Sequence, residues 1–140
     1  MPKPPDPDHT VISFTVPGPA TPEQKRQVRM GRNAARVDTP KARDYKALVS
    51  LAAAQAMGED PPLEGALRVD IIAHHLRPKS WPKWRQEPTS RPDRTNYAKL
   101  AEDACNGIVY VDDSQIVAGE VGKRISDREY LEIRVEWLGW

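Results

Sequence analysis

Carboxylate side chains gather in one short stretch in the second half of this 140-residue chain. Asp93 follows an Arg-Pro pair, Asp103 lies ten residues later, and Asp112 and Asp113 stand side by side after an apolar run. Oxygen ligands of this kind suit a hard cation such as Mg²⁺, which keeps several waters and needs few protein ligands. The chemistry that they could support is phosphate-ester hydrolysis, because a bound cation activates water and stabilises the developing charge.

Two elements would position these carboxylates. A helix is predicted from about residue 96 to residue 105, because Asp93 or Thr95 can accept a free backbone N–H at its start. It is expected to end at an Asn-Gly pair, a usual C-terminal signal. The four-residue apolar run 108–111 predicts a buried strand, which would place the paired aspartates at its end.

The predicted helix has an apolar and a polar face. Four residues at helical spacing form the apolar face: Tyr97, Leu100, Ala101 and Ala104. Asn96, Lys99 and Asp103 share the other face. A plainer interpretation is that Asp93 only caps the helix, the paired aspartates only form a turn, and the polar face is merely solvated. Spacing alone slightly favours this plainer interpretation.

The motif itself resembles a known family. The run P-D-x-T-N-x-x-K-x-x-x-D-x-x-N-G, followed by an apolar segment and D-D-S-Q, resembles the RusA family of Holliday-junction resolvases. That family's pattern reads D-x-D-N-x-x-K-x-x-x-D and then D-D-x-Q after a strand. The matching positions here are Asp93, Asn96, Lys99, Asp103, Asp112, Asp113 and Gln115. The resemblance is strongest in this segment and extends more loosely over most of the chain.

This resemblance implies a small endodeoxyribonuclease that resolves four-way DNA junctions in recombination and repair. It implies Mg²⁺ or Mn²⁺ as the cofactor, a homodimer, and no nucleotide cofactor. Asp93 and Asp113 would be the metal-binding catalytic carboxylates, with Asp112 assisting, and Lys99 would support cleavage. The residues expected to fix Lys99 and the metal ligands lie on the same helix: Thr95, Asn96 and Asp103.

Thr95 departs from the family pattern, which has a second carboxylate at this position. A hydroxyl carries no charge and is a weaker metal ligand. Either Asp112 or Asp103 supplies the missing oxygen, or metal affinity falls, or activity is lost. The first outcome is favoured because Asp112 is beside Asp113 and Lys99 is retained. The alternative function is a catalytically weakened, structure-selective DNA-binding protein.

Composition bounds the other possibilities. With 39% hydrophobic and 29% charged residues, the chain is globular, and its net charge of +1 gives no overall basic field. The single cysteine, Cys105, excludes an internal disulfide and is interpreted as a packing residue. No apolar run suits a transmembrane helix or a signal peptide, so we expect a cytoplasmic protein in a bacterial cell. The resemblance points to a phage or prophage origin.

Two basic segments are candidates for DNA contact. Residues 21–37 predict a basic ribbon that turns at Gly31–Asn33, and residues 77–90 predict a long loop with two tryptophans, Trp81 and Trp84. The alternatives are a solvated loop for the first and tryptophans that pin the second to the body. The predicted DNA-binding cations are Lys25, Arg26, Arg29, Arg32, Arg36, Lys83, Arg85 and Arg91.

The element order predicts one α+β domain, residues 11–140, after a disordered proline-rich tail, residues 1–10. Strands are expected at 11–16 and 67–76, and a closing hairpin is expected from 116–125 and 130–137. A core helix should run from Pro40 to Met57, with an apolar stripe of Tyr45, Leu48, Val49, Ala52 and Ala56. We expect a mixed or antiparallel sheet with two packed helices.

Two polar features of the predicted strand 67–76 have structural interpretations. Asp70 should pair with an arginine on the open face of the sheet, although it could also lie near the metal. His74 and His75 should point to opposite faces, one packed and one exposed, and therefore should not form a metal site.

Overall fold

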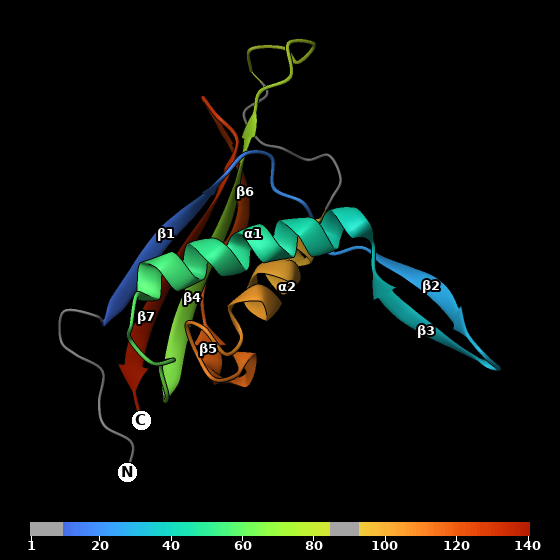
Figure 1. Cartoon of the computed structure of the whole chain (residues 1–140). Coiled ribbons are helices and arrows are strands. Elements are labelled where there is room, and N and C mark those ends of the chain that lie inside the picture. Colours follow the sequence, from blue (N-terminus) through green and yellow to red (C-terminus); the bar gives the residue numbers. More distant parts are fainter. Residues whose placement is uncertain (1–9, 85–92) are drawn as a thin grey trace.

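The computed structural model describes residues 10–84 and 93–140. It contains a five-stranded sheet, a separate two-stranded ribbon and two helices (Figure 1). The elements in chain order are β1 (Val11–Pro17), β2 (Lys25–Met30), β3 (Asn33–Asp38), α1 (Pro40–Met57), β4 (Ala66–Leu76), α2 (Arg94–Cys105), the 3₁₀ turn η2 (Asp113–Gln115), β5 (Ile116–Ala118), β6 (Val121–Ser126) and β7 (Tyr130–Gly139). Residues 1–9 of the predicted tail lie outside the described residues.

Strand β4 is the centre of the larger sheet. The strand order is β1-β7-β4-β5, and β6 also pairs with β4. β7 is antiparallel to β4 and β1, whereas β5 and β6 run parallel to β4. Alternate residues of β4 are buried beneath the helices, as predicted: Leu67, Val69, Ile71 and Ala73. The mixed sheet with two packed helices confirms the predicted α+β class.

The predicted closing hairpin is wrong, because its two strands are not neighbours. β6 pairs with one side of β4 and β7 pairs with the other, so residues 127–129 cross the end of β4. The expected long strand 116–125 is also broken at Gly119, where a side chain would collide with the backbone carbonyl of Val69. Alternation shows which face of a strand is buried, but it does not identify the neighbouring strand. β4 lies at the centre of the sheet because it has the longest apolar run and is buried by its neighbours.

Helix α1 has the predicted ends. Thr39 is the N-cap, and its Oγ accepts the backbone N–H of Ala42 at 3.3 Å, while Gly58 follows the last helical residue with φ of 59°. The buried stripe is Ala42, Tyr45, Val49, Ala53 and Met57. Leu48, predicted to be in the stripe, is 53% exposed. The stripe advances by four residues at each turn from Tyr45, and Leu48 therefore falls on its solvent side.

The apolar run 108–111 does not form the predicted strand, and only its two middle residues are buried. Tyr110 makes only isolated bridges, to Leu63 and Asn106, and the backbone turns between residues 107 and 109. Val109 and Tyr110 are nonetheless fully buried. A short apolar run signals burial, and the same burial can be achieved by a compact turn.

Asp70, His74 and His75 of β4 make ion-pair and packing contacts within the sheet and its neighbours. Asp70 forms ion pairs with Arg68 at 3.1 Å and Arg134 at 3.7 Å on the open face, as predicted. His74 is buried against Tyr130, with ring centroids 4.1 Å apart. His75 points to the opposite face but is half-buried, so the prediction that one histidine is exposed is wrong. Within residues 10–84 and 93–140, no helix is long and apolar enough to cross a membrane.

Strands β2 and β3 form the predicted ribbon. They pair antiparallel from Lys25↔Asp38 to Met30↔Asn33, and Gly31, with φ of 62°, permits the two-residue turn. The ribbon projects away from the sheet and helices (Figure 1). Its base is joined to α1, because Asp38 accepts from Lys25 at 2.6 Å and lies 3.7 Å from Lys46.

Candidate active site

Helix α2 presents the polar part of the motif to the surface. It begins at Arg94, two residues before the predicted start, and ends at Cys105. All four residues of the predicted apolar face are buried. The full buried set is Tyr97, Ala98, Leu100, Ala101, Ala104 and Cys105. Burial raises the pKa of the Cys105 thiol to about 12, which agrees with a packing role. Burying this face turns the opposite, polar face outward.

Asp93 is the N-cap residue of α2, but its side chain makes no capping hydrogen bond. The backbone is extended there, with φ of −68° and ψ of 147°, and the carboxylate is exposed. Thr95 and Asn96 are also exposed in the first turn. The interpretation of Asp93 as only a helix cap is therefore not supported, since its carboxylate does not serve the cap.

The D-D-S-Q segment forms the short turn η2 rather than a strand end. The Asp112 carboxylate accepts the backbone N–H of Ser114 at 3.2 Å, and the Gln115 side chain accepts the backbone N–H of Asp112 at 2.9 Å. The Gln115 amide also donates to the carbonyls of Leu63 and Gly65 at 2.9 and 3.0 Å. Asp112 and Gln115 thus fold and attach the turn.

Asp113 lies beside the last turn of α2, where acidic groups meet. The pKa of Asp103 is raised, first by burial and then by the charges of Glu23 and Asp113, while Lys46 opposes the shift. The pKa of Glu102 is also raised, first by burial and then by the charges of Asp113 and Asp103. The arrangement concentrates negative charge between α2 and η2, where a cation would be stabilised.

Glu23 and Lys46 belong to this site but were not predicted. Lys99 lies 3.3 Å from Glu23, which is largely buried, and the Glu23 backbone N–H donates to the Asn96 carbonyl at 3.0 Å. These contacts bring the chain segment before β2 against α2. Neither residue had a sequence signal, because Glu23 lies in an irregular segment and Lys46 lies on a helix interpreted as purely structural.

The predicted site residues do not all come together. Asp103 and Asp113 are neighbours, and Lys99 is one helical turn from Asp103. Asp93 lies about 15 Å from Asp103 along the helix axis, at 1.5 Å per residue. In the part of the chain that the structure describes, no three His, Cys, Asp or Glu side chains are grouped to hold one ion.

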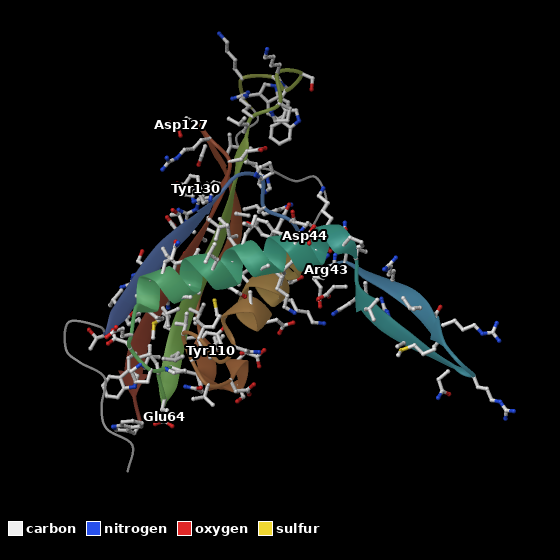
Figure 2. All side chains as sticks on the ribbon, in the orientation of Figure 1. Arg43, Asp44, Glu64, Tyr110, Asp127 and Tyr130 are labelled. Atoms are coloured by element: carbon white, nitrogen blue, oxygen red, sulfur yellow. The ribbon has the colours of Figure 1, made fainter. Side chains whose placement is uncertain are left out.

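The predicted DNA-binding cations also differ among themselves. Arg26, Arg29, Arg32 and Arg36 are exposed. They lie on the ribbon, which projects away from the rest of the molecule (Figure 2). Lys25 is instead paired with Asp38 and lies 3.5 Å from Glu23. Lys83 is exposed, and Trp84 beside it is 80% exposed. Arg85 and Arg91 lie outside the described residues.

Comparison with known proteins agrees with the motif. Residues 17–136 match the family described as Endodeoxyribonuclease RusA. The chain is also 31% identical over 136 residues to the Bacillus subtilis (strain 168) protein described as "Uncharacterized protein YqaN", with 89% of this chain and 94% of the relative covered. The family match takes in the ribbon, both helices and strands β4, β5 and β6 with most of β7, and it begins at the last residue of β1. The chain therefore belongs to the RusA family of endodeoxyribonucleases.

Proposed function

We propose that this protein is a divalent-metal-dependent endonuclease that resolves four-way DNA junctions by paired phosphodiester hydrolysis. Family membership supports the class of enzyme. The observation that carries the site assignment is the meeting of Asp103 and Asp113 beside Lys99 and Glu23. Two acidic oxygen donors, a nearby ammonium and a cationic arm are the groups that hydrolysis of a DNA phosphate requires.

The acidic pair fits Mg²⁺ or Mn²⁺. One or two carboxylates suffice for Mg²⁺, which keeps several of its waters. The raised pKa of Asp103 reflects burial and nearby like charge that a divalent cation would offset. A bound ion would supply an activated water and neutralise charge developing on the phosphate. We assign Asp113 and Asp103 as its ligands, while Asp112 holds the turn that presents Asp113.

Lys99 is suited to orient the phosphate that is cut. Its side chain is 66% exposed, and the ion pair with Glu23 keeps its ammonium on the same side of α2 as Asp103. An incoming phosphate would compete with Glu23 for this ammonium. Asp93, at the other end of the polar face, keeps the catalytic role that the family pattern gives it. Its carboxylate does not cap the helix, which supports that role.

The ribbon arginines and Lys83 would hold the DNA arms through their phosphates. A four-way junction has approximate two-fold symmetry, and its resolution needs two matched cuts. A symmetric homodimer presents two identical sites related by a two-fold axis. The proposal therefore includes a homodimer as the active species.

The test is a cleavage assay on a synthetic four-way junction beside a linear duplex of the same sequence, with Mg²⁺ or with a chelator. We expect symmetric, metal-dependent cuts in the junction alone. Asp113→Asn should lower the cleavage rate by about 10³-fold or more. Junction binding should be retained or strengthened, since one negative charge facing DNA is removed.

The matched control is Asp127→Asn, which removes the same charge from a turn at the opposite end of the sheet from Tyr110 (Figure 2). This variant should cut at the wild-type rate. Tight junction binding by the wild-type protein without cutting would replace the proposal with the DNA-binding alternative and would implicate Thr95. Cleavage by Asp113→Asn would refute the site assignment.

A further inference from the structure

The two faces of the β2–β3 ribbon carry different kinds of side chain. Opposed residues of an antiparallel pair share a face, and the faces alternate along each strand. The pairs Gln27↔Arg36 and Arg29↔Ala34 therefore place two arginines on one face. The other face is mostly apolar and carries Val28, Met30, Ala35 and Val37, with Asn33 opposite Met30 at the tip and Arg26 near the base.

The apolar face is not covered by the body of the protein. Met30, beside the turn, is 62% exposed, and Val28 and Val37 are only half-buried. The ribbon contacts the body mainly near its base, where β3 meets α1 (Figure 1). An isolated two-stranded ribbon is marginally stable in water, so a face of this kind favours an occupant.

The charge of the ribbon indicates what that occupant is. Arg26, Arg29, Arg32 and Arg36 form no ion pair with any other residue that the structure describes. The Arg29 side chain donates to the Gly31 carbonyl at 3.3 Å, which holds its positive charge near the tip of the ribbon. A second copy of the ribbon would be repelled by these charges, whereas a polyanion would be attracted.

We propose that the apolar face, with Met30 at its tip, contacts unstacked bases at the branch point of the DNA while the opposite face holds phosphates. This inference rests on the proposed function and adds the residue that distinguishes a branch from a duplex. Apolar side chains such as methionine insert between base steps in proteins that kink DNA. A branch point offers open base faces, and a continuous duplex does not.

The dimensions of the ribbon permit this contact. Strands of six residues reach about 20 Å from the body at roughly 3.3 Å per residue. A two-stranded ribbon also fits the major groove of DNA. Arginines on one face can therefore follow the backbone while Met30 reaches the bases between the arms.

The test uses junctions and matched duplexes that carry 2-aminopurine at the branch position, whose fluorescence rises when it is unstacked, with a chelator present to prevent cutting. The wild-type protein should raise the signal on the junction. Met30→Ser should abolish this rise and weaken junction binding about tenfold, while duplex binding changes by less than about twofold. Met30→Leu should restore the signal.

The matched control is Arg29→Gln, which should weaken binding to junction and duplex alike, because it removes a phosphate contact. If the wild-type protein binds and cuts junctions and Met30→Ser still gives the full fluorescence rise, this inference alone would be overturned. Absence of junction binding by the wild-type protein would instead refute the proposed function. Loss of the dimer in Met30→Ser, measured by sedimentation, would show that the apolar face is a protein interface and would also overturn the inference.

Discussion

The two ends of α2 carry motif carboxylates in different surroundings. At the C-terminal end, Asp103 meets Asp113 from η2, and Glu23 and Lys46 from other parts of the chain lie nearby. At the N-terminal end, Asp93 is exposed and makes no capping hydrogen bond. One linear motif thus supplies both a crowded acidic site and a separate carboxylate that does not cap its helix. Two predictions test whether the two ends act together or apart, and a third tests the charges at the C-terminal end alone.

The first prediction concerns Asp93 at the N-terminal end of α2 and its effect on junction cleavage. Asp93→Asn should lower junction cleavage about 10³-fold, because the family pattern assigns a catalytic carboxylate to this position. Binding to the junction, measured by gel shift, should not weaken. Asp127→Asn, which removes the same charge from the turn between β6 and β7, is the matched control and should keep full activity. Full activity in Asp93→Asn would reduce the working site to the C-terminal end.

A smaller effect separates the ends by metal binding to the free protein. At ten times its dissociation constant, Mg²⁺ should stabilise the wild-type fold by about 1.4 kcal/mol, because it binds only the folded site. Asp113→Asn should lose this stabilisation, and Asp93→Asn should retain it. Thermal unfolding with and without Mg²⁺ provides the measurement. Loss of the shift in both variants would mean that the two ends meet around one ion in solution.

The smallest effect is the pH dependence of stability without metal. The pKa of Asp103 is raised in the folded protein, so its ionisation destabilises the fold. Its contribution to stability is fully present below the unfolded pKa of 3.8 and is lost as pH rises through the folded value. Asp103→Asn should therefore raise the free energy of unfolding at pH 7 by roughly 0.5 kcal/mol, a modest figure because solvent screens the group.

The gain from Asp103→Asn should disappear as the pH approaches 3.8 in urea unfolding experiments. Asp112 provides a control of opposite sign. Hydrogen bonds from Ser114 lower the pKa of Asp112, so Asp112→Asn should destabilise the protein at neutral pH and lose that effect in acid. Destabilisation by Asp103→Asn at pH 7 would show that its contact with Lys46 outweighs the burial and like-charge repulsion.

Elements set by local chemistry were predicted well. Thr39, Pro40 and Gly58 define the ends of α1 because capping depends on adjacent residues. The ribbon was predicted from a turn sequence between two short segments, and its pairing is also local. The alternation in β4 and β7 identified their buried faces, because side-chain direction follows from position in the strand.

Features that depend on distant contacts were not predictable in this way. Periodicity could not show that β4 separates β6 from β7, since the neighbour of a strand is decided by the whole sheet. The segment around Tyr110 is buried without forming a strand ladder. Leu48 is on the solvent side of α1 because packing on the sheet selects one stripe from a helix that is apolar on several sides.

The candidate site also combines features set by local sequence with features set by distant contacts. The family motif, the polar face of α2 and the acidic residues of the turn could all be recognised in the sequence, because they depend on residue type and short spacing. The meeting of Asp113 with Asp103 rather than Asp93, and the approach of Glu23 and Lys46, follow from the three-dimensional fold. The physical reason is that charges interact through space, and the fold sets which distant charges become neighbours.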